Sequence, residues 1–136
     1  KQVTLTLTSD PPGPDLTVEA DAARIGQVLG NLLSNALRHT APGGRVELSV
    51  ASRDGWVELQ VADDGDGISA QHLPHIFERF YRADTARDRE RGGTGVGLAI
   101  SRAIAEAHGG QLSAASEGPG RGAVLTLLLP RRSGRS

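Results

Sequence analysis

A pair of short segments with alternating apolar and polar residues places the strongest constraint on the fold of this chain. Residues 46–50 and 57–61 alternate on either side of the turn sequence Arg53-Asp54-Gly55, a pattern that predicts an antiparallel hairpin. Parallel strands instead need a crossover of a dozen or more residues. Hairpins rather than βαβ alternation therefore argue against a Rossmann or P-loop fold.

The other elements are predicted from periodicity and from glycine and proline. Further strands are expected at residues 3–8, 16–20, 111–116 and 123–129. Helices are expected from Asp21 as N-cap to about residue 39, over about 69–81, and from about 94 to 108. This mixed order favours an α+β fold: a two-layer α/β sandwich with a mostly antiparallel sheet and helices on one face.

Composition limits the number of domains and the classes of partner. The chain has 136 residues, which suits one domain, expected over residues 1–130 with a disordered tail at 131–136. A formal net charge of −1 provides no basic surface for nucleic acid or a membrane. Absence of cysteine excludes disulfides and cysteine–zinc sites. Since the chain lacks an initiator Met and begins in mid-pattern, we expect it to be a domain of a larger protein.

Glycines gather at the start of the last predicted helix, at positions 92, 93, 95 and 97. Glycine lets backbone N–H groups approach a phosphate, and the helix N-terminus favours negative charge. A P-loop is excluded, because its motif needs a lysine and the only lysine is Lys1. A flexible turn before an ordinary amphipathic helix is the alternative reading of this stretch.

A polar stripe runs along the first predicted helix beside its apolar face. Asn31, Asn35 and Arg38 lie on one side of the helix at about 100° per residue. An Asn carbonyl oxygen is a suitable Mg²⁺ ligand, and an Arg one turn later suits phosphate. The alternative is a solvated helix face.

The hairpin is followed directly by Asp63-Asp64-Gly65-Asp66-Gly67-Ile68. An EF-hand calcium loop is excluded, because its twelfth position would be Pro74 rather than Glu. A carboxylate at the end of a buried strand, followed by glycines that admit a flat ring, suits adenine, whose exocyclic amine donates to the acid. The alternative is a plain surface turn.

Together these motifs resemble the ATP-binding catalytic domain of bacterial sensor histidine kinases. That superfamily also contains DNA gyrase, heat-shock chaperones and mismatch-repair ATPases. The matching stretches keep the family's order and spacing: the asparagine box at residues 31–39, the first glycine box at 63–68, the phenylalanine box at 76–82, the second glycine box at 93–98 and the final one at 120–123. In the final box, alanine stands at residue 123 where threonine is commoner.

The resemblance implies a Bergerat-type ATP-binding fold that binds ATP and Mg²⁺, with residues 69–94 as the ATP lid. It implies that Asn35 coordinates Mg²⁺ with help from Asn31, and that Arg38 and Arg82 act on phosphate as catalytic residues beside these two asparagines. Asp63 would read adenine. The remaining implied nucleotide contacts are His39, which stands where the family often has Tyr, Gly65, Gly67, Ile68, Phe77, Tyr81, Gly93, Thr94, Gly95, Val96, Gly97 and Leu98.

The resemblance further implies a protein-histidine kinase of a two-component system. The domain would donate the γ-phosphoryl of ATP to a histidine on the kinase's dimerisation domain, and a response regulator would receive it indirectly. Hydrolytic members carry a Glu base at the position of Asn31, and an amide cannot accept that proton. Alternatives are a nucleotide-dependent conformational switch without catalysis and a hydrolytic ATPase of the same superfamily.

The histidines do not match the phospho-acceptor motif of such kinases. None of His39, His72, His75 and His108 begins that motif, so the chain alone is expected to lack autophosphorylation. We expect a monomeric, cytoplasmic domain without nucleic-acid or direct membrane contact. The resemblance implies that it belongs to a homodimeric sensor kinase of the inner membrane.

Overall fold

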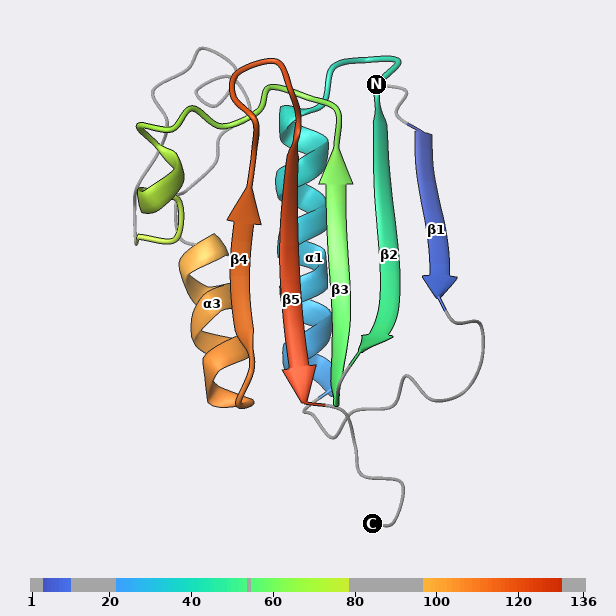
Figure 1. Ribbon diagram of the computed structural model, residues 1–136, viewed down its shortest axis with the longest axis vertical. Coiled ribbons are helices and arrows are strands. Elements are labelled where there is room, and N and C mark those ends of the chain that lie inside the picture. Colours follow the sequence, from blue (N-terminus) through green and yellow to red (C-terminus); the bar gives the residue numbers. More distant parts are fainter. Residues whose placement is uncertain (1–3, 11–21, 54, 79–96, 131–136) are drawn as a thin grey trace.

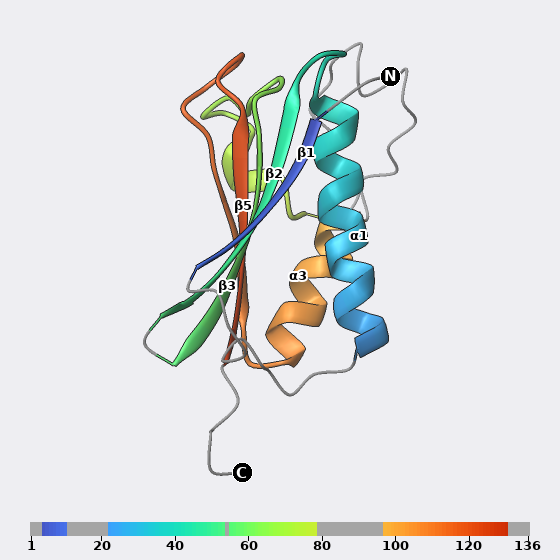
Figure 2. The same ribbon diagram turned by 90° about the vertical axis from the view of Figure 1, so that its right-hand side faces the viewer.

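The computed structural model describes residues 4–10, 22–53, 55–78 and 97–130, which form two layers. One layer is a five-stranded sheet with the strand order β1-β2-β3-β5-β4 (Figure 1). The other layer is the helix pair α1 (Ala22–His39) and α3 (Gly97–Ala107), which covers one face of the sheet (Figure 2). The predicted α+β two-layer fold is confirmed.

The sheet consists of β1 (Thr4–Asp10), β2 (Arg45–Arg53), β3 (Trp56–Asp63), β4 (Gln111–Ala115) and β5 (Ala123–Pro130). The β2–β3 pair is the predicted antiparallel hairpin, and the β3–β5 and β4–β5 pairs are also antiparallel. The expectation of a mostly antiparallel sheet is therefore confirmed.

The edge strand β1 pairs with β2 in parallel, a feature that the alternation pattern did not predict. Thr4 lies opposite Arg45, and Asp10 lies opposite Ala51. Helix α1 is the element between the two strands in the sequence, and it provides the crossover that parallel neighbours need. The sheet thus carries one βαβ unit at its edge.

The core lies between the two layers and holds α1 against the sheet. Val28, Leu32 and Ala36 are fully buried at a spacing of four residues, so one face of α1 packs on the sheet. On β5, every second residue from 123 to 129 is buried. A fully buried Val or Leu side chain contributes about 1.5–3 kcal/mol, and Val28 and Leu32 thereby hold α1 against the sheet.

The helix predicted over residues 69–81 is wrong for the residues that the structure describes. Residues 69–78 contain only the 3₁₀ helix η1 (Leu73–His75), preceded by a turn in which the Ser69 carbonyl oxygen accepts from the N–H groups of residues 72 and 73. Pro74 has no N–H, and in an α-helix that began at Ser69 it would occupy an interior position. Proline therefore limits this segment to short turns.

Several predictions fall on residues outside the described ranges. They are the N-cap at Asp21, the strand at 16–20, the second half of the lid over 79–94, the helix start at 94–96 and the tail at 131–136. These stay predictions.

Candidate functional site

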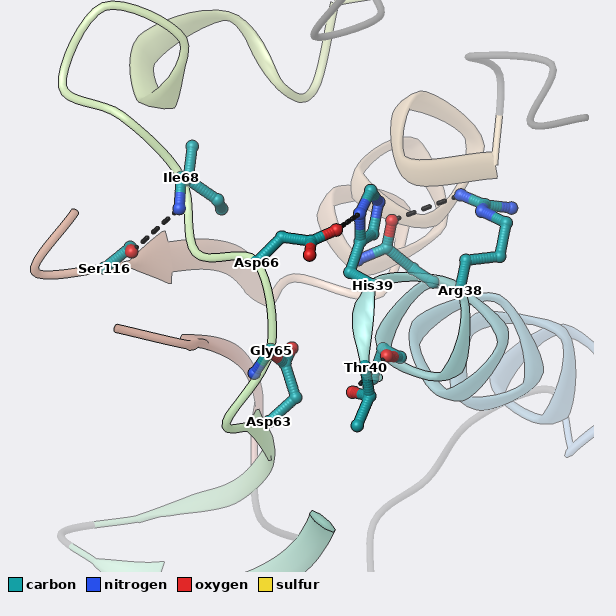
Figure 3. Close-up of polar contacts among 10 residues, drawn as sticks. Arg38, His39, Thr40, Asp63, Gly65, Asp66, Ile68 and Ser116 are labelled. Atoms are coloured by element: carbon teal, nitrogen blue, oxygen red, sulfur yellow. Dashed lines mark hydrogen bonds and ion pairs between the residues drawn. The ribbon is translucent and has the colours of Figure 1, made fainter. Parts of the chain in front are cut away.

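The ends of α1 and β3 lie at the same edge of the molecule, the upper edge in Figure 1. The loop that follows β3, residues 64–68, is bonded to the end of α1. The Asp66 N–H donates to the His39 carbonyl oxygen at 2.9 Å, and His39 Nδ1 lies 3.2 Å from Asp66 Oδ2 (Figure 3). The structure therefore brings the asparagine box and the first glycine box together.

The loop comes closest to α1 at Gly65. A Cβ there would overlap the His39 carbonyl oxygen and lie 3.0 Å from the Thr40 Cα. Thr40 is fully buried, and its Oγ1 donates to the Ala36 carbonyl oxygen at 2.7 Å. Because the helix end is anchored in this way, only glycine fits at position 65.

Asp63 presents a partly buried carboxyl group at the end of β3. Its Oδ1 accepts a hydrogen bond from the Gly65 N–H at 2.9 Å. Burial raises the pKa of Asp63 above its ordinary value, whereas backbone hydrogen bonds from Gly65 and Ala123 and the proximity of His39 act in the opposite direction. A carboxylate that is poorly hydrated in this way is a strong acceptor for a ligand N–H group.

A glycine-rich turn between β4 and β5, residues 116–122, holds the other side of the 64–68 loop. The Gly120 N–H donates to the Asp66 carbonyl oxygen at 2.7 Å, and the Gly122 N–H donates to the Gly65 carbonyl oxygen at 3.3 Å. The predicted final glycine box is therefore part of the same site. It contributes backbone groups that support the loop.

Ser116 lies outside every predicted motif, yet its hydroxyl oxygen accepts from the Ile68 N–H at 2.9 Å (Figure 3). Nearby, Gly67 has a φ of 72°, and a Cβ there would overlap the Gly118 carbonyl oxygen. A serine between a strand and a glycine-rich turn is a typical partner for local backbone groups, and this is the signal that could have identified it.

Arg38 and Asn35 lie one turn apart near the end of α1. The Arg38 Nη2 donates to the Asn35 Oδ1 at 3.2 Å, and Figure 3 marks this bond at the Arg38 side chain. The Arg38 Nε is buried and has no hydrogen-bond partner among the residues that the structure describes. An unsatisfied buried guanidinium N–H is costly, and an anionic oxygen is the partner that would satisfy it best.

Asn31 joins α1 to the first turn of α3. Its Nδ2 donates to the Gly97 carbonyl oxygen at 3.2 Å and to the Ser101 Oγ at 3.1 Å. Ser101 is fully buried and donates in turn to the Gly97 carbonyl oxygen at 2.8 Å. The amide nitrogen of Asn31 is thus engaged with α3, a role for which the helical stripe alone gave no signal.

The apolar members of the predicted site pack at its margin. Ile68, Phe77 and Leu98 are partly buried against the core. The guanidinium carbon of Arg102 lies 5.8 Å from the centre of the Phe77 ring, within the range of a cation–π contact. The predicted site residues that lie outside the described ranges are Tyr81, Arg82, Gly93, Thr94, Gly95 and Val96.

Within the described part of the chain, no three His, Cys, Asp or Glu side chains gather as a metal centre would require. The amide oxygens of Asn35 and Asn31 are groups that can serve as ligands of a cation such as Mg²⁺.

The family model for histidine kinase-, DNA gyrase B- and HSP90-like ATPases matches residues 20–133. This match covers the sheet from β2 onward, both helices and the whole of the described site. The chain belongs to this family. The predicted resemblance is therefore confirmed.

Curated relatives with high identity are sensor histidine kinases. The chain is 46% identical over 119 residues to the sensor histidine kinase YkoH of Bacillus subtilis, covering 88% of this chain and 26% of that protein. It is 45% identical over 118 residues to the signal transduction histidine-protein kinase BaeS of Escherichia coli, covering 86% of this chain and 25% of that protein. The chain thus spans about a quarter of these relatives' length.

Solved structures of the same class have the same fold. The mycobacterial sensor histidine kinase MprB matches with a TM-score of 0.79 and 31% identity, over 96% of this chain and 83% of that one. Full-length ShkA in complex with AMPPNP matches with a TM-score of 0.81 and 31% identity, over 97% of this chain and 26% of that one.

Among the helices that the structure describes, none has the length and apolar character needed to cross a membrane.

The close approach at Gly65 generates a testable prediction. Gly65→Ala should lower the free energy of unfolding by about 1–3 kcal/mol, because the added methyl group must displace either the loop or the end of α1. Gly30→Ala is the matched control: nothing lies near its Cβ, and it should raise stability by about 0.5–1 kcal/mol. Denaturant unfolding of both variants checks this, and equal stability of the two would contradict the close approach.

Proposed function

We propose that this chain binds Mg²⁺-ATP at the edge formed by α1, the 64–68 loop and the start of α3. The observation that carries the proposal is the buried Arg38 Nε without a partner in the described residues, beside the Asn35 amide oxygen. A phosphate oxygen supplies what Arg38 lacks, and Mg²⁺ is the cation that Asn35 suits. Membership of an ATPase family and the likeness to an AMPPNP complex support the same ligand.

The base end of the proposed site is Asp63. Its carboxylate accepts from the exocyclic amine of adenine. The space beside Gly65 and Gly67 is taken by the carbonyl oxygens of His39 and Gly118 rather than left open for the ring, so these glycines act by setting the loop that positions the carboxylate. Guanine presents a carbonyl oxygen at the corresponding position, and two acceptors facing each other repel. Burial of Asp63 strengthens both effects, since charges interact more strongly where water is displaced.

The phosphate end of the proposed site is built from side chains of α1 and the backbone at the start of α3. Arg38 binds phosphate oxygens through its guanidinium group, and Asn35 offers the second lone pair of its amide oxygen to the cation. When bound, Mg²⁺ neutralises charge that develops on the phosphate oxygens. Glycines at 93, 95 and 97 provide backbone N–H groups for the same phosphates.

Asn31 favours phosphoryl transfer to an external acceptor over hydrolysis. Its amide cannot take a proton from water at neutral pH. Because its nitrogen donates to Gly97 and Ser101, its carbonyl oxygen is the atom that remains for a cation. In this role Asn31 assists Asn35 in binding Mg²⁺.

In the full-length protein we expect this domain to act as the catalytic part of a sensor histidine kinase. The bond between the γ-phosphorus and the bridging oxygen of ATP breaks, a bond from that phosphorus to an imidazole nitrogen of the acceptor histidine forms, and ADP leaves. The acceptor lies on the dimerisation domain of a homodimeric, membrane-bound kinase, and a response regulator receives the phosphoryl group next. The catalytic domain itself is cytoplasmic and monomeric when isolated, and Arg82 contacts the γ-phosphate.

Asp63→Asn should weaken binding of ATP by about 10- to 150-fold, which corresponds to a charge-assisted hydrogen bond worth about 1.5–3 kcal/mol. Asp64→Asn is the matched control, because the Asp64 Oδ1 accepts from the Arg45 backbone N–H at 2.9 Å. Isothermal titration calorimetry of both variants checks this. Similar affinities of the wild type for ATP and GTP would refute adenine recognition by Asp63.

The raised pKa of Asp63 predicts a pH dependence of base recognition. Since the carboxyl group becomes protonated at a higher pH than an ordinary Asp, affinity for adenosine should fall as the pH is lowered, beginning above the ordinary range. Adenosine is chosen because it carries no phosphate that titrates. In Asp63→Asn the same titration should be flat, and an identical pH profile for both proteins would assign the effect to another group.

Asn35→Ala should weaken binding of ATP in the presence of Mg²⁺ and have little effect in its absence, because it removes a direct oxygen ligand of the cation. Ser34→Ala is the control, since Ser34 is an exposed neighbour on the same helix. Calorimetric titrations with and without Mg²⁺ check this. Equal losses under both conditions would indicate that Asn35 acts on the structure instead.

The chain alone should bind ATP yet neither label itself nor hydrolyse ATP appreciably. Mixing it with the dimerisation domain of the same kinase and radiolabelled ATP should place acid-labile phosphate on that domain, slowly, because covalent linkage no longer provides a high effective concentration. Label on the chain itself, or rapid hydrolysis, would show that the chemistry is wrongly assigned.

A further inference from the structure

We propose that Ser116 is a positioning residue: it holds the 64–68 loop, and through it the Asp63 carboxylate, in the conformation that binds adenine. It does not act on the phosphate end of the site. The inference rests on the proposed function. Ser116 follows β4 directly, begins the 116–122 turn and is half-buried beside the 64–68 loop. Figure 3 shows its side chain directed at the backbone of Ile68.

The hydroxyl group of Ser116 uses its full hydrogen-bonding capacity on backbone groups. It donates to the Gly122 carbonyl oxygen at 2.7 Å, and it accepts from the N–H groups of Ile68 at 2.9 Å and Gly118 at 3.2 Å. The longer approach to the Gly118 carbonyl oxygen, at 3.4 Å, competes poorly for the single proton. One proton and two lone pairs are all that a hydroxyl possesses.

These bonds belong to a hydrogen-bond network that joins the 64–68 loop to the 116–122 turn. Gly122, which accepts from Ser116, donates its own N–H to the Gly65 carbonyl oxygen at 3.3 Å. The 65–68 segment is thus held near one end through Gly122 and at the other end through Ser116. Gly122 has a φ of 71°, and a Cβ there would overlap the Asp63 carbonyl oxygen, so the 116–122 turn lies directly against the backbone where the loop begins.

The position of the Asp63 carboxylate depends on this hydrogen-bond network. Its Oδ1 accepts from the Gly65 N–H, and the Gly65 carbonyl oxygen accepts in turn from Gly122. Loss of the Ser116 hydroxyl leaves the N–H groups of Ile68 and Gly118 without their acceptor, and the loop must move to satisfy them. The hydrogen bond between the Arg38 and Asn35 side chains lies within α1. A change at Ser116 therefore separates base recognition from phosphate binding.

The test compares adenosine and Mg²⁺-tripolyphosphate as separate probes of the two ends of the site. Ser116→Ala should weaken adenosine binding about tenfold, the size of effect expected when the hydrogen bond between Asp63 and adenine is lost, and leave tripolyphosphate binding unchanged. Ser116→Thr keeps the hydroxyl and should restore most of the adenosine affinity. Ser113→Ala, at an exposed position of the same strand, should behave as the wild type.

Wild-type adenosine affinity in Ser116→Ala would overturn the inference. So would equal losses for adenosine and tripolyphosphate, or a folded Ser116→Thr that binds adenosine as weakly as the alanine variant. If Ser116→Ala does not fold, Ser116→Cys takes its place, because a thiol of similar size is only a weak donor and acceptor; unchanged adenosine affinity in that variant would equally overturn it. Failure of the wild type to bind ATP would instead contradict the proposed function.

Discussion

The backbone of the loop after β3 lies directly against the last turn of α1, and the geometry of the site depends on this contact. The contact is possible because residue 65 has no side chain and because the Asp66 N–H donates to the His39 carbonyl oxygen. A helix C-terminus leaves carbonyl groups without intrahelical partners. Here the loop satisfies one of them, so capping of the helix and placement of Asp63 result from the same interaction.

Elements with strong periodicity were predicted well, since burial on one face determines them. The apolar residues of α1 at 28, 32 and 36 are fully buried, as helical spacing requires, and the β2–β3 hairpin follows its alternation. The meeting of the asparagine and first glycine boxes could also be anticipated, because the resemblance to a known family assigned both to one ligand. Local pattern and family likeness were therefore sufficient for the fold class and for the meeting of these two boxes.

Features that depend on long-range backbone contacts could not be read from the sequence. The parallel pairing of β1 with β2 requires knowledge that α1 crosses the sheet between them. A single proline at position 74 replaced the helix predicted from residue 69 by short turns. Ser116 and Ser101 carry hydrogen bonds to segments far away in the chain, and nothing in their sequence surroundings identifies those partners.

The two ends of the proposed nucleotide site are held by different means. At the base end, hydrogen bonds of the loop backbone fix Asp63 and its glycines between α1 and the 116–122 turn. At the phosphate end, the described groups are side chains: Arg38 rests on Asn35 with its Nε unsatisfied, and Asn31 bonds to α3. Side chains can change between staggered rotamers one at a time, whereas a backbone segment held by several hydrogen bonds must move as a unit. Adenine would therefore meet a preformed surface, and the phosphates would reorganise the groups that hold them.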